Sequence, residues 1–346
     1  MMSFRSLAIW GALVAFLFPL FVSWYAGGWV ARYYSPPFSF DDIPDLSGKT
    51  AIVTGSNVGI GFTTARALAR KNCKVVLAAR SDERGKAAVQ KIQNDLQGLP
   101  GAHLVEYMRL DLASFSQVAS FVRGFRAKHG KLDILVLNAA VIMNGYEETV
   151  NGFESQIGVN HLGHFLLVKL LLPMIRYSKT RVVHVSSASH RDSYKEGIVF
   201  DSWKGPNAKA LYSRFFAYGQ SKLANVLFSN ELAVRLNGTG ATSNALHPGI
   251  IATEGQRHLR DLLKQNVVTS VVLLLFNLLW GASVLSLDDG ALTQLYVATS
   301  PKLAGVTGKY FIPIGLDRTS DVAPAAKNAT LQKLLWTVSE KHTAGF

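Results

Sequence analysis

The sequence predicts an α/β fold in which a doubly wound, parallel, seven-stranded sheet follows an N-terminal transmembrane helix. Seven short apolar runs alternate with longer helical patterns, a glycine-rich turn follows the first run, and an uncharged segment precedes them all. Nearly continuous apolar strands are typical of parallel sheets that are covered on both faces. Strands that alternate with helices in this way indicate a doubly wound fold.

The first element is an apolar segment near the N-terminus. Residues 6–31 carry no charge, and aromatic residues cluster near both ends of the segment. As a helix it would be about 39 Å long, enough to cross a hydrocarbon core of about 30 Å. A cleaved signal peptide is the alternative, but its apolar region usually has only about 7–15 residues. We therefore expect a single-pass membrane anchor at residues 1–34 and a proline-containing linker at residues 35–48.

The rest of the chain, residues 49–346, is expected to form a single catalytic domain, because no second linker interrupts it. The single cysteine, Cys73, excludes an intrachain disulfide framework and fits a domain that faces the cytosol. We expect the anchor to lie in the endoplasmic reticulum membrane. The formal charge of +13 suits an anionic membrane surface or an anionic cofactor. The chain has no basic run with interleaved aromatic residues, which would indicate nucleic-acid binding.

Each predicted strand is an apolar run of strand length that is bounded by small or polar residues. Length separates the strands from the helical patterns between them, such as FTTARALARK after the first strand. The seven strands are expected at residues 50–55, 74–80, 105–111, 133–140, 181–187, 242–249 and 309–315.

The turn TGSNVGIG joins the first strand to its helix and indicates a Rossmann-type dinucleotide site. Its glycines allow a tight turn, a close approach of the backbone to a phosphate, and close packing of the helix on the strand. The N-terminus of the helix then faces the pyrophosphate. The residues expected to bind the cofactor here are Gly55, Ser56, Asn57, Gly59, Ile60 and Gly61.

The end of the second strand predicts which dinucleotide binds. A site for NAD usually has an acidic residue there, which holds the ribose 2′-hydroxyl. This chain has Arg80 instead, and an arginine can pair with the 2′-phosphate of NADP(H). We therefore expect NADP(H) rather than NAD(H). Asp111 ends the third strand, where it either accepts a hydrogen bond from the adenine amine or caps the next helix.

In these motifs and their order, the chain resembles the short-chain dehydrogenase/reductase family from about residue 47 to residue 315. The glycine turn matches in full, whereas the family's Asn-Asn-Ala-Gly tetrapeptide appears as Leu137-Asn138-Ala139-Ala140, with two departures. The resemblance implies a catalytic tetrad of Asn160, Ser187, Tyr218 and Lys222, and cofactor contacts at Asn138, Tyr218, Lys222, Pro248, Gly249, Ile251 and Thr253.

Tyr218 and Lys222 are four residues apart, so on a helix they lie on one face. The resemblance implies that Tyr218 is the acid/base, and that Lys222 lowers its pKa and binds the nicotinamide ribose. Ser187 would stabilise the substrate oxygen, and Asn160 would hold a water that links Lys222 to solvent. Lys169 either reaches the cofactor or is a surface lysine. His161 and His164 lack further ligands nearby, and no metal site is expected.

The stretch of thirty residues between Ser187 and Tyr218 resembles that of the retinol dehydrogenase-like branch. Residues 265–287 again lack charge, and either span the membrane or form an apolar lid. A span would separate parts of one sheet, so we expect a substrate lid at about residues 254–288 in contact with membrane lipid. The expected activity is hydride transfer between NADP(H) and a lipophilic alcohol/carbonyl pair that is retinoid-, steroid- or polyprenoid-like.

Two alternatives to this activity stay open at the level of the sequence. One is a membrane-bound, non-catalytic scaffold, which would keep the fold and the cofactor site without turnover. The other is a photoreductase that resembles protochlorophyllide reductase, although the single cysteine counts against it. The sequence leaves a homodimer open.

Overall fold

The computed structural model of the chain describes residues 38–251 and 284–346. The expected membrane anchor and residues 254–283 of the expected lid lie outside the described residues. The main sheet has eight strands in the order β10-β9-β6-β5-β4-β1-β2-β3, and seven of them are parallel. The parallel strands are β1 (Thr50–Thr54), β2 (Lys74–Ala79), β3 (Val105–Arg109), β4 (Ile134–Leu137), β5 (Arg181–Val185), β6 (Thr242–Leu246) and β9 (Tyr310–Ile312).

These seven strands coincide with the seven predicted from the sequence, so the doubly wound fold is confirmed. The prediction of a seven-stranded, wholly parallel sheet is wrong by one strand. β10 (Leu316–Asp317) turns back at Gly315 and pairs antiparallel with β9. A strand of two residues is too short to show any periodicity. A separate two-stranded sheet joins β7 (Ile250–Ile251) to β8 (Val284–Leu285).

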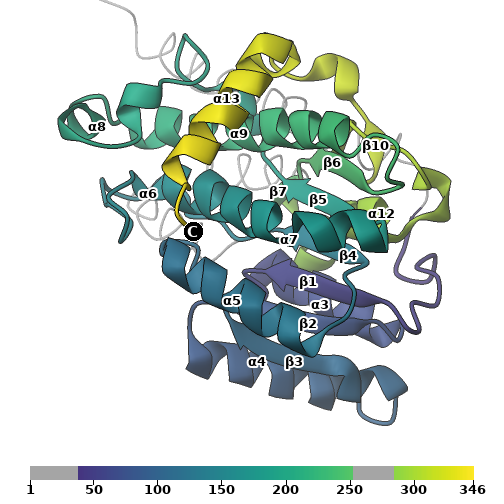
Figure 1. The fold of residues 1–346 in the computed structure, drawn as a ribbon. Coiled ribbons are helices and arrows are strands. Elements are labelled where there is room, and N and C mark those ends of the chain that lie inside the picture. Colours follow the sequence, from purple (N-terminus) through teal and green to yellow (C-terminus); the bar gives the residue numbers. More distant parts are fainter. Residues whose placement is uncertain (1–37, 252–283) are drawn as a thin grey trace, which may run out of the picture.

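Helices cover both faces of the sheet, as Figure 1 shows. One apolar cluster packs α3 (Gly59–Arg70), α4 (Asp82–Asp95) and α12 (Leu287–Thr299) on one face. The larger cluster packs the remaining long helices on the other face. Those helices are α5 (Phe115–Lys128), α7 (His164–Ser178), α9 (Arg214–Arg235) and α13 (Ala329–His342).

The helix that ends in α7 is long and apolar, but it lies in the core. It begins with α6 (Ser155–Ile157), continues through the π-helical turn η2 (Gly158–Gly163), and forms the middle of its helical layer (Figure 1). Over Ser155–Ser178 it is the one described helix that passes a length and hydropathy test for a membrane span, and 67% of its most apolar window is buried. Its apolar composition is therefore explained by core packing.

The C-terminal helix α13 closes the outer side of this layer. Its Trp336 is 3% exposed, and the ring lies 5.0 Å from the ring of Phe165 on α7 and 5.8 Å from that of Phe228 on α9. Burying an aromatic side chain of this size contributes substantially to the core. At the C-terminus, Phe346 makes an edge contact with Phe115 of α5 at 5.5 Å.

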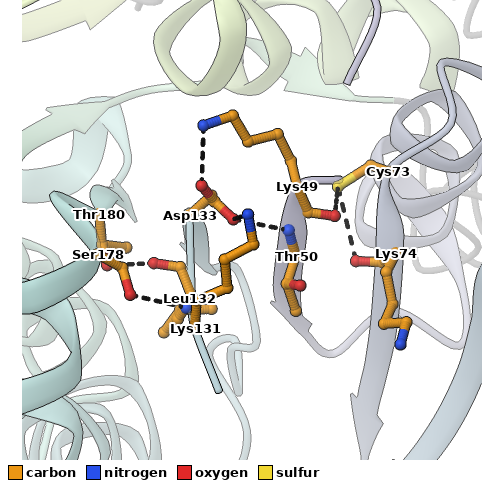
Figure 2. Close-up of polar contacts among 9 residues, drawn as sticks. All are labelled: Lys49, Thr50, Cys73, Lys74, Lys131, Leu132, Asp133, Ser178 and Thr180. Carbon is orange, nitrogen blue, oxygen red and sulfur yellow. Dashed lines mark hydrogen bonds and ion pairs between the residues drawn. The ribbon is translucent and has the colours of Figure 1, made fainter. Parts of the chain in front are cut away.

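Ion pairs and hydrogen bonds close the amino-terminal edge of the sheet, which is drawn in Figure 2. Asp133, just before β4, accepts a hydrogen bond from the backbone N–H of Thr50 at 2.9 Å and pairs with Lys49 at 2.9 Å and Lys131 at 3.6 Å. Nearby, the thiol of Cys73 is buried and donates weakly to the carbonyl of Lys49 at 3.5 Å. Burial raises the pKa of this thiol to about 12, so Cys73 is an unreactive packing residue.

Candidate active site

A cavity of about 1150 Å³ opens at the carboxyl edge of the sheet. In a doubly wound sheet this is the edge at which the loops and the helix N-termini converge on a ligand. The predicted site residues that line the cavity are Gly55, Asn57, Gly59, Ile60, Gly61, Arg80, Asp111, Asn138, Ser187, Tyr218, Lys222, Pro248, Gly249 and Ile251.

Glycine stands at three positions of the turn, and the structure gives a reason for each. Gly55 has φ +64°, and a Cβ there would lie 2.8 Å from the Cα of Ala139. A Cβ at Gly61 would lie 2.4 Å from the Nδ2 of Asn138, so this glycine allows close packing. Gly59 has φ +62°, and a Cβ there would meet no atom within 4 Å, because this glycine borders the open cavity. No side chain caps the first turn of α3, so its backbone N–H groups are free to bind an anion.

Two arginines and a serine line the cavity beyond β2, where the sequence predicts the 2′-phosphate. Arg80 is exposed, and Arg84 follows it in the first turn of α4. The neighbouring acid, Asp82, accepts from the hydroxyl of Tyr107 at 3.0 Å and pairs with Arg109 at 3.4 Å. Within residues 38–251 and 284–346, neither Arg80 nor Arg84 has an ion pair. This part of the cavity therefore presents unpaired positive charge.

Arg84 was not predicted from the sequence, although RSDER places it four residues after Arg80. The signal that could have found it is the N-cap, because the Oγ of Ser81 accepts from the backbone N–H of Arg84. An N-cap there places Arg84 in the first helical turn, beside the end of β2.

Asp111 and Asn138 follow β3 and β4 and also line the cavity. The carboxylate of Asp111 accepts from the N–H of Ala113 at 3.0 Å, so it also caps its own turn. Asn138 donates from Nδ2 to the carbonyl of Thr54 at 2.9 Å and accepts from Gln294 of α12 at 3.2 Å. Asn138 thus locks the end of β4 to the glycine turn.

Tyr218 lies in the second turn of α9 and is 8% exposed. Burial raises the pKa of Tyr218 to about 12, while its side-chain hydrogen bond with Ser187 acts in the opposite direction. The lowering of this pKa that the sequence led us to expect is therefore opposed by burial. Ser187 accepts from the N–H of Ser189 at 3.2 Å, which leaves its hydroxyl proton to donate. A neutral phenol and a donating serine together suit the stabilisation of a carbonyl oxygen.

Lys222 lies one turn further along α9, on the same face as Tyr218. Its Nζ donates to the carbonyl of Val185 at 3.0 Å and lies 5.6 Å from the centre of the Tyr218 ring. Burial lowers the pKa of Lys222 to about 7. The helix is held in place at this point, because Ser186 of the β5 end donates to the carbonyl of Lys222 at 2.7 Å.

Asn160 lies in the π-helical turn η2, next to the cavity but not in its lining. Its side chain accepts from the N–H of Val141 at 2.8 Å, and donates to the carbonyl of Val141 at 2.9 Å and to Ser221 at 3.0 Å. Its main-chain carbonyl accepts from the side chain of Asn225 at 2.7 Å. Asn160 therefore braces the loop after β4 against α9, and its role in holding a water stays a prediction.

Three other predicted residues are not among those that line the cavity. Ser56 is fully buried, and its hydroxyl donates to the carbonyl of Val53 at 2.7 Å. Lys169 is half-buried on α7, away from the cavity lining. Thr253 lies outside the described residues.

The apolar wall next to Tyr218 was missed by the sequence analysis. Ile142 and Met143 come from the loop after β4, and Phe215 comes from the start of α9. Ile142 is 58% exposed and Phe215 is 59% exposed, so both lie at the rim of the cavity. A periodicity argument cannot find such residues, because they come from loops and helix ends.

The two histidines of NHLGH have separate hydrogen-bond partners. The Nε2 of His161 lies 2.7 Å from the hydroxyl of Ser339, and that of His164 lies 2.9 Å from the hydroxyl of Thr54. Among the described residues, no group of three or more metal-ligating side chains is found.

The chain is similar in sequence to known proteins over most of its length. A sequence model of the family described as short chain dehydrogenase matches residues 49–263. The chain is 40% identical to human retinol dehydrogenase 12 over 295 residues, which covers 85% of this chain and 86% of the relative. It is 38% identical to human retinol dehydrogenase 14 over 306 residues, again covering 85% and 86%. The chain therefore belongs to the short-chain dehydrogenase/reductase family and is an oxidoreductase related to the retinol dehydrogenases.

Solved structures share the fold. An uncharacterised protein from Mycobacterium paratuberculosis is 31% identical, with a TM-score of 0.65, and the match covers 89% of this chain and 98% of that one. L-Sorbose reductase from Gluconobacter frateurii, solved with NADPH and L-sorbose, is 22% identical with a TM-score of 0.60, covering 79% and 97%. Membership of the family implies a nicotinamide cofactor, and the glycine turn with its uncapped helix fits the diphosphate of such a group.

Proposed function

We propose that the protein transfers hydride between NADP(H) and a lipophilic alcohol/carbonyl pair that is retinoid-, steroid- or polyprenoid-like. The observation that carries this proposal is the cavity itself, because one cavity is lined by Tyr218 and Ser187, by the apolar wall, and by two arginines without ion pairs among the described residues. The names of the two human relatives, both retinol dehydrogenases, support a lipophilic substrate.

The nicotinamide supplies or accepts the hydride, and the residues of the chain move the proton. In the direction of reduction, Tyr218 as a neutral phenol donates its proton to the carbonyl oxygen. Ser187 donates a hydrogen bond to the same oxygen and stabilises the charge that develops on it. Lys222 stabilises the phenolate that Tyr218 leaves behind, because an ammonium nearby favours the charged form. In the direction of oxidation the same groups act in reverse.

The preference for NADP(H) follows from Arg80 and Arg84. A 2′-phosphate carries charge that a guanidinium binds with two parallel hydrogen bonds. Two acids lie between these arginines in the sequence, but neither Asp82 nor Glu83 is among the residues that line the cavity, and Asp82 is engaged with Tyr107 and Arg109. A 2′-hydroxyl carries no charge to pair with the two arginines, so NAD(H) binds more weakly.

The proposal includes a single-pass anchor at residues 1–34 in the endoplasmic reticulum membrane, with the domain in the cytosol and an apolar lid at about residues 254–288. Its support is the absence of charge from residues 6–31 and 265–287. Removing residues 1–35 should leave NADPH binding intact and make membrane binding weaker, so that mild detergent releases the protein. A truncated protein that is wholly soluble without detergent would contradict the interfacial lid.

The test of function is a substrate screen with full-length protein solubilised in detergent. NADPH oxidation is followed with retinal, steroid ketones, polyprenals and short soluble aldehydes, in the dark and in the light. We expect turnover in the dark with at least one lipophilic carbonyl. NADPH binding without turnover on the whole panel would favour the scaffold, and turnover only in the light would favour the photoreductase.

A further inference from the structure

Two buried histidines lie beside Ser187 and Asn160, and the mechanism above uses neither of them. His190 follows Ser187 by three residues in the short helix η3 (Ala188–Arg191), and His164 follows Asn160 by four residues at the start of α7. Their side chains are 0% and 1% exposed. Burying a ring nitrogen without a partner costs free energy, and where both nitrogens have partners those neighbours set the position of the proton.

The proton of His190 lies on Nδ1. The backbone N–H of Ala323 donates to the Nε2 of His190, with 3.2 Å between the two nitrogens, and a backbone N–H can only donate. The Nε2 must therefore accept, which leaves the single proton of the neutral ring on Nδ1. That nitrogen lies 2.7 Å from the main-chain carbonyl oxygen of Ser187 and donates to it.

The same reasoning applies to His164. The hydroxyl oxygen of Thr54 accepts from the backbone N–H groups of Asn138 at 2.9 Å and Ala139 at 3.0 Å. Its own proton then goes to the Nε2 of His164 at 2.9 Å, which is closer than its other acceptor, the carbonyl of Val136 at 3.4 Å. The Nδ1 of His164 carries the proton and donates to the carbonyl oxygen of Asn160 at 3.1 Å.

The environment keeps both rings neutral. Burial lowers the pKa of His190 to about 4 and that of His164 to about 4. The hydrogen bonds described above fit neutral rings. At His190, an imidazolium would direct a second N–H at the N–H of Ala323, which is itself a donor.

We propose that His190 and His164 are positioning residues, each a neutral imidazole that ties the main-chain carbonyl of a catalytic-tetrad residue to a distant part of the fold. His190 ties Ser187 to Ala323, next to the short helix η7 (Pro324–Lys327). His164 ties Asn160 to Thr54, the first residue of the glycine turn. The orientation of the Ser187 hydroxyl towards Tyr218 thus depends on a residue that touches neither substrate nor cofactor. This inference rests on the proposed function.

The kinetic test compares two substitutions at His190. Asparagine places an amide N–H near the position of Nδ1, so His190→Asn keeps the bond to the carbonyl of Ser187. Phenylalanine keeps the ring and loses both bonds. We expect His190→Phe to lower kcat by about tenfold or more, because small displacements of a reacting group are costly. NADPH affinity should change by less than about twofold, and His190→Asn should restore kcat to within about threefold of the parent.

A matched control separates positioning from loss of stability. His184 of β5 is also buried, at 1% exposed, and its Nε2 lies 3.1 Å from the hydroxyl of Ser243, which does not belong to the tetrad. His184→Phe should lower the melting temperature as His190→Phe does, and should leave kcat per folded molecule within about twofold. Equal losses of kcat in the two phenylalanine variants, or no rescue by His190→Asn, would overturn the proposal.

A second measurement on the unmodified full-length protein does not depend on turnover. Nitrogen-15 NMR of histidine-labelled protein in detergent distinguishes the two neutral tautomers from the imidazolium. The chain has nine histidines, and the signals of His190 and His164 are assigned by their loss in the asparagine variants. We expect both residues as the Nδ1–H tautomer at pH 7, and an Nε2–H tautomer or an imidazolium at either one overturns its assignment. This result holds whether or not a substrate is found, so the two proposals fail separately.

Discussion

The two edges of the central sheet differ in how the polar groups at the strand ends are satisfied. At the amino edge, Asp133 pairs with Lys49 and Lys131 and accepts from the backbone of Thr50, so these groups satisfy one another (Figure 2). At the carboxyl edge, the glycine turn, Arg80 and Tyr218 surround a cavity and present polar groups to it. The same strands build both edges, so the position of a residue along a strand decides whether it serves stability or binding.

The reason lies in the parallel topology. Every strand of such a sheet ends at the same edge, where the following helices begin and their N-terminal N–H groups lack partners. A ligand can satisfy these groups, whereas at the amino edge the chain must satisfy its own. Substitutions at the two edges should therefore change different measured quantities.

Acid should destabilise the fold through its buried histidines. The pKa values of His190 and His164 are lowered to about 4, and those of His161 and His184 to about 3, because all four side chains are buried. The unfolded chain takes up these protons near pH 6.5, so the stability is fully present above that value and falls as the pH drops towards 4. One pKa unit corresponds to about 1.4 kcal/mol. Each histidine therefore lowers the free energy of unfolding by roughly 2 kcal/mol between pH 6.5 and pH 5.

Urea unfolding at pH 7.5 and pH 5 measures this loss. The His190→Asn variant has one such group fewer, so its free energy of unfolding should fall less between the two pH values. Equal losses in parent and variant would show that His190 does not contribute.

Tyr218→Phe should give the largest change in activity. Removing a positioned acid/base costs about a hundredfold or more in turnover, whereas the phenyl ring keeps the packing. NADPH binding and the melting temperature should stay near those of the parent. Turnover is measured with the best substrate of the screen, and a variant with near-normal turnover would rule out Tyr218 as the proton donor.

Arg80→Asp should change the choice of cofactor. A carboxylate repels the 2′-phosphate and can accept from a 2′-hydroxyl, so the affinity for NADPH should fall by about tenfold or more relative to that for NADH. Competition binding of the two cofactors measures the ratio. Arg84→Asp should act in the same direction with a smaller effect. A parent protein that already prefers NADH would refute this assignment.

Substitutions of Asp133 should have the smallest effect, and this effect should be confined to the amino edge of the sheet. Asp133→Ala leaves the N–H of Thr50 without its partner, and should cost about 1–3 kcal/mol of stability. Asp133→Asn keeps that acceptor and loses only ion pairs with two half-exposed lysines, so it should cost about 1 kcal/mol or less. In both variants kcat per folded molecule should equal that of the parent. A fall in kcat would mean that the two edges are coupled.

The fold could be predicted almost completely from the sequence, because the apolar runs and helical patterns of a doubly wound sheet each extend over several residues. The bounds of all seven parallel strands lie within three residues of the predicted bounds. The eighth strand, β10, was missed because two residues carry no pattern. The glycine turn was predicted with its mechanism, since positive φ and close approach leave glycine as the residue that fits.

The site was predicted less completely, for physical reasons that differ by residue. Motif spacing predicted Tyr218 and Lys222, but it could not predict that burial would raise the pKa of one and lower that of the other. Ser56 was expected at the cofactor because it lies within the turn, and its hydroxyl bonds to Val53 instead. His190 was missed because its two partners, Ser187 and Ala323, are far apart in the sequence.

The C-terminal helix α13 has a consequence for folding during synthesis. Trp336 and Leu335 complete the apolar layer over α7 and α9, yet they follow every strand of the sheet in the sequence. On the ribosome, the aromatic rings of Phe165 and Phe228 therefore lack this cover until α13 has been made. Domains fold as units during synthesis, and this one can close its core only once α13 has emerged. A stop codon shortly before Ala329 should thus yield a chain that is held by chaperones and degraded, even though every strand and every predicted active-site residue has been made.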